Sequence, residues 1–181
     1  MRLFVAIEIT PDIRDRILEF AEKLKSKIPN ARWTRPEGLH ITLKFLGNVP
    51  DENVPAIESA LKKVESRSFA ITIETVGVFP NPKSPRVLWT GVAAGAELGK
   101  LAGEIDETTA QLGFEAEKRA FSPHVTLARF KEADWKMNLS PILLGGHPSF
   151  GTMTAQEFHL YESKLSPEGS RYIKRASFAL K

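Results

Sequence analysis

Apolar residues along this chain recur with a period of two in some segments and with a helical period of about 3.6 in others. Residues 3–9 (LFVAIEI) are apolar and β-branched, which is typical of a strand. Residues 10–30 place their apolar positions at helical spacing. Thr10 is a suitable N-cap, and Pro11 stands at the first helical position. The chain therefore opens with a predicted strand followed by a predicted helix.

Both patterns continue along the rest of the chain. Residues 39–47 (LHITLKFLG) predict a strand, and residues 51–67 predict a helix. Residues 69–79 and 86–93 predict two more strands. The remaining expectations, in chain order, are a helix over residues 95–114, a strand over 124–130, an ambiguous and partly helical stretch over 132–146, and a closing hairpin of residues 153–165 and 171–180 around Pro167 and Gly169.

One short pattern occurs twice in these predicted strands. HITLKFLG contains His40 and Thr42, and HVTLARF contains His124 and Thr126, both in the order H-x-T-L. Each residue of the second pair follows its counterpart in the first by 84 positions. A repeat at one offset indicates that the two strands hold equivalent places in a duplicated fold.

The duplication extends beyond the motif. Leu3 shifted by the same 84 positions falls on Val87, so strand, helix and H-x-T-L strand recur in one order. We predict an α+β fold in which residues 1–181 form a single bilobal domain. Its halves would be two mostly antiparallel sheets with outer helices. A pseudo-twofold axis between the lobes would place the motif strands opposite each other across a central cleft.

Strand geometry assigns side chains to faces. Successive side chains alternate, so Lys44 is expected on the same face as His40 and Thr42. In the second strand the same parity places Arg129 on the face opposite to His124, outside the cleft unless a β-bulge intervenes. We therefore expect the cleft to contain the histidines, the threonines and one lysine.

Two imidazoles and two hydroxyls in one cleft match the needs of phosphodiester hydrolysis. Attack of water on phosphorus requires a base for the water proton and an acid that protonates the departing oxygen. Histidine titrates near neutral pH and can fill either role, each contributing about 10²- to 10⁴-fold in rate. Threonine hydroxyls can donate hydrogen bonds to the non-bridging phosphate oxygens. This chemistry requires no metal ion and no cofactor, and we expect none.

Other interpretations of these residues are weaker. A single buried histidine is more often structural, and threonine is common in strands because it is β-branched. Two copies at one offset favour the functional interpretation. A zinc site would require closer histidine spacing, whereas His147 lies in a GGHPS loop and His159 in the closing hairpin. A nucleophilic serine and a nucleotide-triphosphate site lack their usual G-x-S-x-G and Gly-rich motifs.

Composition limits the choice further. The 181 residues contain no cysteine, which excludes disulfides, thiolate metal sites and cysteine nucleophiles. A net charge of +3 permits an anionic ligand but is too mild to identify nucleic acid by itself. The opening apolar run is interrupted by Glu8 and is too short for a signal peptide or a membrane span. We expect a cytoplasmic protein without a membrane partner.

HITLKFLG and HVTLARF, together with the opening RLFVAIEI and the central GVFPNPKSPRVLWTGV, resemble segments of the two-histidine phosphoesterases. Within that superfamily the chain is similar to the bacterial and archaeal RNA 2′,3′-cyclic phosphodiesterases, also called 2′-5′ RNA ligases. The resemblance implies a bilobal fold with a water-filled cleft. It also implies metal-free hydrolysis of terminal 2′,3′-cyclic phosphates to 2′-phosphates, and reversible 2′-5′ joining of RNA.

The same resemblance implies a role for each motif residue. His40 is the expected proton donor to the departing 3′ oxygen, and His124 is the expected proton acceptor that activates water. Thr42 and Thr126 match the phosphate-binding threonines of that family. The expected partner is RNA with a 2′,3′-cyclic phosphate end, with tRNA fragments among the candidates. We expect the protein to be a monomer.

Four further residues are candidate substrate contacts. The charge of Lys44 on the motif face suits a phosphate, and Arg86 could reach the cleft mouth. Phe79 and Trp89 could stack on a base. Two alternative functions stay open: a cyclic phosphodiesterase for small nucleotides such as ADP-ribose 1″,2″-cyclic phosphate, and a non-catalytic module that binds RNA ends.

Overall fold

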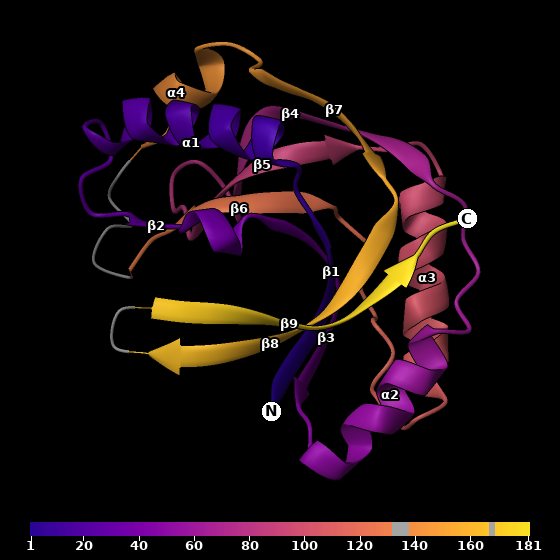
Figure 1. Cartoon of the computed structure of the whole chain (residues 1–181). Helices are drawn as coiled ribbons and strands as arrows, with labels where there is room; N and C mark the ends of the chain where they lie inside the picture. Colours follow the sequence, from indigo (N-terminus) through magenta and orange to yellow (C-terminus); the bar gives the residue numbers. More distant parts are fainter. Residues whose placement is uncertain (132–137, 167–168) are drawn as a thin grey trace.

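Two antiparallel sheets make up most of the molecule (Figure 1). The structure is a computed structural model, and it describes residues 1–131, 138–166 and 169–181. The first sheet has the strand order β3 (His40–Asn48), β1 (Arg2–Glu8), β8 (Glu157–Ser166) and β9 (Gly169–Ala179). The second sheet has the order β2 (Arg32–Trp33), β6 (His124–Arg129), β5 (Val87–Ala93), β4 (Phe69–Phe79) and β7 (Ser149–Ala155).

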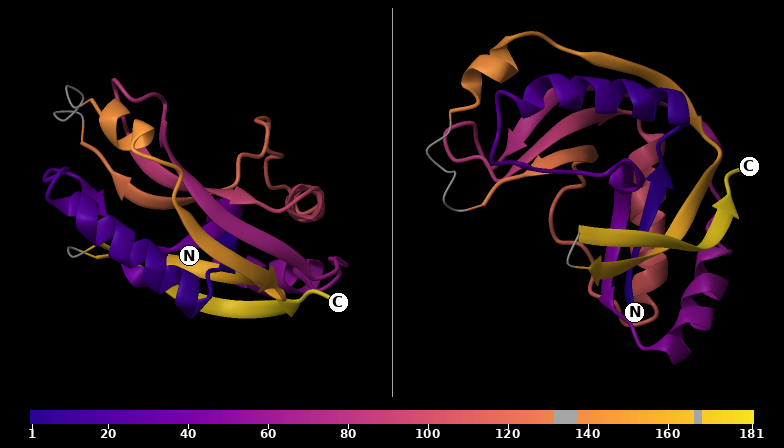
Figure 2. Two further views of the ribbon diagram at one scale, coloured as in Figure 1. Left: turned by 90° about the horizontal axis from the view of Figure 1, so that it is seen from above. Right: turned by 60° about the vertical axis from the view of Figure 1, so that its left-hand side comes forward.

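Each long helix covers the sheet that contains the motif strand of the other half of the chain (Figures 1 and 2). α1 (Pro11–Lys25) packs against β7 of the second sheet, whereas α3 (Glu97–Ala110) packs against β3 of the first. α2 (Val54–Leu61) packs against α3, and the short α4 (Ser140–Leu144) precedes β7. The predicted α+β class, with antiparallel sheets and outer helices, is confirmed.

The apolar period that predicts α1 also explains its packing. Ile13, Ile17 and Leu24 lie on one side of the helix and are buried. Phe20 meets Phe150 of β7 with ring centroids 5.3 Å apart. Full burial of one such side chain contributes about 1.5–3 kcal/mol, so this stripe of apolar residues holds the helix on the second sheet.

Several segments differ from the expected elements. α2 is shorter than residues 51–67, because a 3₁₀ turn, Asp51–Asn53, precedes it and the helix ends at Leu61. The strand expected over residues 153–165 is two strands in different sheets, since β7 pairs with β4 and β8 with β1. β7 buries Met153 and Ala155 at alternate positions, whereas burial in β8 begins at Phe158. This shift in the alternation marks the change of sheet. The two-residue strand β2 was not expected.

Two expectations fall partly on residues that the structure does not describe. In the ambiguous stretch over 132–146, residues 132–137 lie outside the described residues, and the remainder contains α4. In the closing hairpin, Pro167 also lies outside the described residues, and Gly169 begins β9. The helical expectation for the first stretch is thus confirmed only over Ser140–Leu144.

The duplication is visible in the strand register. The matching stretch runs in the first ladder from the pair Glu8 and His40 to the pair Phe4 and Phe45. In the second ladder it runs from Gly91 and His124 to Val87 and Arg129. The motif strands β3 and β6 are therefore offset by 84 positions, as expected. Their partners β1 and β5 are offset by 83, so Phe4 and not Leu3 matches Val87. The predicted match of Leu3 was wrong by one residue.

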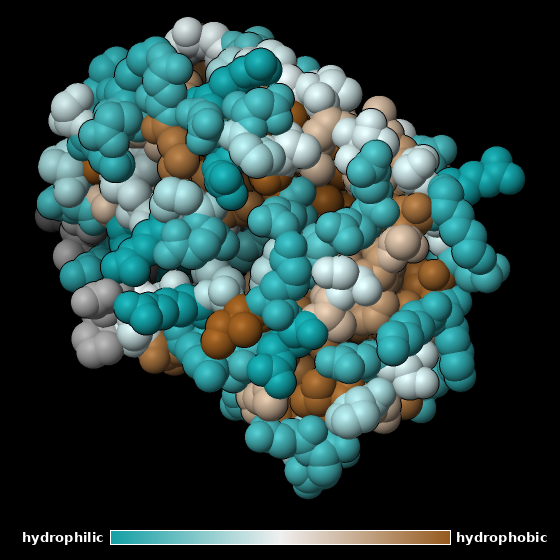
Figure 3. Space-filling model, viewed as in Figure 1, coloured by the Kyte–Doolittle hydropathy of each residue, from teal (hydrophilic) through white to brown (hydrophobic). Residues whose placement is uncertain are grey.

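Most buried apolar residues form one core that contains residues of both sheets and of α1, α2 and α3. A separate small cluster consists of Phe4, Ala6 and Tyr161, with Tyr172 packed against it. The face seen in Figure 3 is mostly hydrophilic, with hydrophobic residues in small patches between polar ones. Among the described residues, no helix combines the length and the apolar character that crossing a membrane requires.

Candidate active site

Both motif strands contain a β-bulge directly after the threonine. In the first ladder Ala6 pairs with Thr42 and Val5 with Lys44, so Leu43 is the extra residue. In the second ladder Trp89 pairs with Thr126 and Leu88 with Ala128, so Leu127 is the extra residue. A bulge reverses the parity of the side chains that follow it. From Lys44 in the first strand and Ala128 in the second, the side chains therefore lie on the opposite face from the one that simple alternation predicts.

Lys44 shows the consequence in the first strand. Its side chain is only 7% exposed and donates hydrogen bonds to the carboxylate of Asp106 in α3 and to the carbonyl of Glu115. Burial alone would raise the pKa of Asp106, but the hydrogen bonds from Lys44 and the Glu117 N–H lower it overall. The prediction that Lys44 shares the face of His40 was wrong, and its ammonium group anchors β3 to α3 instead.

Arg129 shows the same effect in the second strand. Simple alternation places it outside the cleft, and the bulge at Leu127 returns it to the side of His124 and Thr126. Phe45 occupies the equivalent place in the first strand and is 67% exposed. The exception foreseen for Arg129, an intervening bulge, is thus the arrangement that the structure adopts.

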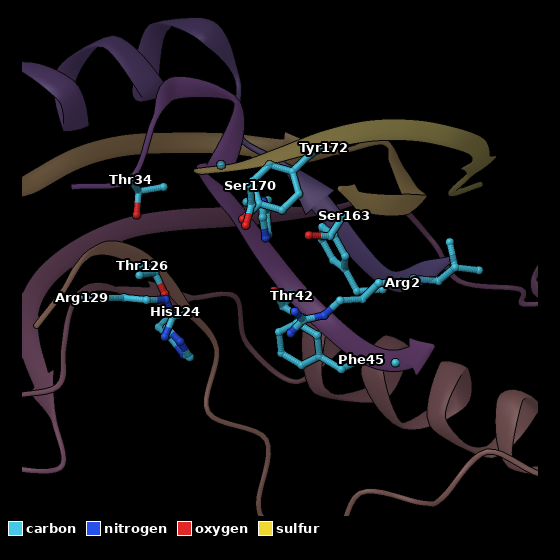
Figure 4. A pocket seen from close by; sticks show the side chains of 15 residues that line it. Arg2, Thr34, Thr42, Phe45, His124, Thr126, Arg129, Ser163, Ser170 and Tyr172 are labelled. Atoms are coloured by element: carbon cyan, nitrogen blue, oxygen red, sulfur yellow. The ribbon is translucent and has the colours of Figure 1, made fainter. Parts of the chain in front are cut away.

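The four motif residues converge on one cavity of about 450 Å³ between the two sheets (Figure 4). We call it the central cavity. In Figure 4, His124, Thr126 and Arg129 project from β6, whereas Thr42 and Phe45 project from β3. The other polar or charged residues that line the cavity are Arg2, Thr34, Ser163, Ser170 and Tyr172. None of the described lining residues is acidic, so the cavity suits an anion.

His40 lies among aromatic rings on the first sheet. Its ring centroid is 4.8 Å from that of Phe4, 5.2 Å from that of Tyr172 and 6.2 Å from that of Tyr161. Burial, and after it the cation of Arg129, lowers the pKa of His40 from 6.5 to about 4. The imidazole of His40 is therefore neutral at pH 7 while no anion is bound beside it.

His124 has a different setting. Its Nδ1 lies 2.8 Å from the carbonyl oxygen of Ser122. A carbonyl can only accept, so Nδ1 carries the hydrogen and donates it. In neutral His124 the lone pair is then on Nε2, and this tautomer suits a proton acceptor.

The aromatic residues predicted to contact substrate lie beside His124. Phe79 meets the imidazole edge-on with centroids 5.1 Å apart, and Trp89 lies 6.4 Å from it. Gly77 pairs with Trp89 across β4 and β5, and a Cβ atom there would lie 2.2 Å from the indole ring. Glycine is thus required for this indole position. Arg86 is exposed before β5 and is not among the described residues that line the central cavity.

Sequence reasoning missed the residues that surround His40. Tyr161 and Tyr172 come from β8 and β9, which hold the places in the first sheet that β4 and β7 hold in the second. The H-x-T-L motif lies on other strands, so its repeat gave no signal for the two tyrosines. Phe45 and Arg129 do occupy equivalent positions in the repeat, but their placement depends on the two bulges.

Comparisons with known proteins agree with this architecture. A family model described as LigT-like phosphoesterase matches residues 7–89 and residues 92–172. The RNA 2′,3′-cyclic phosphodiesterase of Archaeoglobus fulgidus is 39% identical over 172 residues, which cover 95% of this chain and 96% of that protein. The protein of the same name from Methanocaldococcus jannaschii is 37% identical over 173 residues, with coverages of 95% and 96%.

A solved structure extends the similarity to three dimensions. The crystal structure of E. coli LigT complexed with 3′-AMP superposes with a TM-score of 0.81 at 28% identity, covering 99% of this chain and 97% of that one. The fold and the paired H-x-T-L strands define a class, the two-histidine phosphoesterases. The chain belongs to the LigT-like phosphoesterase family and is an enzyme, a phosphoric diester hydrolase. The resemblance predicted from the motifs is thereby confirmed.

Proposed function

We propose that this enzyme hydrolyses the 2′,3′-cyclic phosphate at the end of an RNA to a 2′-phosphate, with His40 and His124 as its acid and base and without a metal ion. The observation that carries the proposal is the convergence of both H-x-T pairs on the central cavity. The names of the curated relatives, RNA 2′,3′-cyclic phosphodiesterases, support the choice of substrate.

The reaction we infer has one proton donor and one proton acceptor. Nε2 of His124 takes a proton from water as the water oxygen attacks phosphorus, because Nδ1 is engaged by the carbonyl of Ser122. The bond between phosphorus and the 3′ oxygen breaks, and His40 protonates that oxygen. The product carries a 3′ hydroxyl and a 2′-phosphate. One proton has then moved from His40 to His124, and exchange with solvent restores both residues.

The bound phosphate also accounts for the protonation of His40. We infer that the hydroxyls of Thr42 and Thr126 donate hydrogen bonds to the non-bridging oxygens, while Arg129 supplies an opposite charge. A phosphate anion beside Arg129 offsets the cation that lowers the pKa of His40, and it favours the imidazolium directly. Substrate binding therefore raises the pKa of the residue that must donate the proton.

The same site can use a second nucleophile. A ribose hydroxyl in place of water can open the cyclic phosphate, with the two histidines in the same roles, and the product is a 2′-5′ linkage. We infer that the enzyme catalyses this joining when two RNA ends are held together. Fragments of tRNA with cyclic phosphate ends are candidate substrates for both reactions.

Phosphate-end analysis of a short RNA with a 2′,3′-cyclic phosphate tests the proposal. The wild-type enzyme in EDTA should produce a 2′-phosphate end. His40→Ala and His124→Ala should each lower the rate by at least about 10²-fold. The matched control is His147→Ala, because His147 is exposed on the loop before β7 and does not line the central cavity. Unchanged RNA, or activity that EDTA abolishes, would refute the metal-free mechanism.

A further inference from the structure

A second cavity of about 220 Å³ adjoins the central cavity. We call it the arginine cavity. The residues that line both cavities are Thr34, Gly38, Arg129, Ser170 and Tyr172. Because these residues form a common wall, a ligand held in the central cavity can extend into the arginine cavity without leaving the protein surface.

The charged residues that the structure describes in the arginine cavity all have one sign. Arg32 and Arg35 line it together with Arg129, and none of its described lining residues is acidic. Arg32 and Arg129 are direct partners in the ladder between β2 and β6. Like charges that face each other across two strands destabilise a sheet. An anion bound between these two guanidinium groups would remove that cost.

The other lining residues indicate what kind of anion this is. Guanidinium groups bind phosphate through paired, charge-assisted hydrogen bonds. Trp33 and Tyr172 place aromatic rings at the same cavity, and such rings stack on unpaired bases. Phosphates and bases next to each other are the repeating chemistry of single-stranded RNA.

We propose that the arginine cavity binds the phosphodiester that precedes the terminal nucleotide of the substrate, with Arg32 and Arg129 as its ligands. This inference rests on the proposed function, since it takes the cyclic phosphate to lie in the central cavity. It defines the minimal good substrate as a dinucleotide with a cyclic phosphate end. A mononucleotide leaves the arginine cavity empty and reacts less efficiently.

The first test compares kcat/KM for a 2′,3′-cyclic mononucleotide with that for a dinucleotide with the same terminal residue. The wild-type enzyme should prefer the dinucleotide by about tenfold or more. Arg32→Gln should remove most of this preference. Arg67→Gln is the matched control, because Arg67 is exposed on the loop before β4 and lines neither cavity. That variant should keep the full preference.

A second test changes the substrate instead of the protein. A methylphosphonate in place of the internal phosphodiester removes its charge and leaves the reacting cyclic phosphate intact. This change should lower kcat/KM of the wild-type enzyme by about the same factor as Arg32→Gln does. In the Arg32→Gln variant the methylphosphonate should lower kcat/KM little further. The slope of log(kcat/KM) against log[salt] should also become less steep by about 0.7 in either case, as for one phosphate of a single strand.

The outcomes separate the two proposals. If the wild-type enzyme hydrolyses neither cyclic substrate, the proposed function fails and the inference falls with it. If both are hydrolysed equally well, or if the methylphosphonate and Arg32→Gln reduce the rate independently, the arginine cavity does not bind the phosphodiester while the proposed function stands. A larger Arg32-dependent advantage for ADP-ribose 1″,2″-cyclic phosphate, whose diphosphate could occupy the same cavity, would overturn the assignment to RNA.

Discussion

The two motif strands, β3 and β6, have the same backbone geometry but carry different side chains around the motif. Each pairs with its neighbour in the same register and has a bulge after its threonine. The two residues after the bulge differ: Lys44 and Phe45 in the first strand are replaced by Ala128 and Arg129 in the second. The duplicated backbone thus fixes where the histidines and threonines lie. Residues outside the repeated motif make the two sides of the cavity unequal.

This difference is largest at the histidines themselves. Aromatic rings lie beside both histidines, and at His40 burial and Arg129 lower the pKa to about 4. His124 donates from Nδ1 to a carbonyl, which directs its Nε2 lone pair away from that contact. A symmetric pair could not distinguish an acid from a base. The proposed in-line hydrolysis requires such a distinction, and the proposal assigns the acid role to His40 and the base role to His124.

The largest expected effect tests this division of roles. A substrate whose bridging 3′ oxygen is replaced by sulfur needs little protonation of its leaving group. His40→Ala should then lose far less than the 10²- to 10⁴-fold loss expected with the oxygen substrate. His124→Ala should lose a similar factor with both substrates, because water still requires a base. Single-turnover rates measure the comparison, and sulfur rescue of His124→Ala instead of His40→Ala would exchange the roles.

The second-largest expected effect concerns the buried ion pair between Lys44 and Asp106, which only the first motif strand has. Lys44→Met leaves the carboxylate of Asp106 without its cation partner, and we expect a loss of about 3 kcal/mol in the free energy of unfolding. Denaturant unfolding at pH 7 measures it. Lys118→Met is the control, since the Lys118–Glu115 pair is exposed at both ends and should contribute little. Equal stability of the two variants would show that the buried pair does not hold β3 to α3.

The third effect compares the threonines. Thr42→Val and Thr126→Val keep the β-branched shape and remove one hydroxyl each. Loss of a hydrogen bond to a phosphate oxygen should lower kcat/KM by about 10- to 100-fold in each variant. Because Arg129 projects beside Thr126 into the central cavity, we expect the smaller loss at Thr126 (Figure 4). Losses below about twofold at both positions would remove the threonines from the phosphate site.

The sequence predicts the repeated features well and the unequal ones poorly. The H-x-T-L repeat at 84 positions predicts two equivalent strands, and the register confirms that equivalence. The bulges are harder to foresee, because one extra residue leaves an apolar strand pattern nearly unchanged. A signal does exist in the sequence of the first strand, since Leu43 and Leu46 stand three positions apart and alternation would place these two apolar residues on opposite faces. Periodicity also cannot tell which sheet a helix will cover, and α1 and α3 cover the sheets of the opposite halves.

The smallest expected effect concerns the protonation of His40. Arg129→Gln removes the cation beside His40, so the pKa of His40 should rise from about 4 but stay below 6.5, because burial is the larger cause. Titration of the histidine Cε1 resonances by NMR measures the midpoint. His159 is an internal control, since its pKa is lowered first by burial and then by Lys174, and it should not move.

Inorganic phosphate provides the complementary titration. If a phosphate anion binds between Arg129 and His40, its addition to the wild-type enzyme should raise the pKa of His40, and Arg129→Gln should weaken that response. A pKa of His40 that neither the substitution nor phosphate changes would mean that Arg129 and the bound anion do not control this imidazole. The acid role of His40 would then require another source of protonation. The charge of Arg129 on β6 would have no effect on the protonation of His40 on β3.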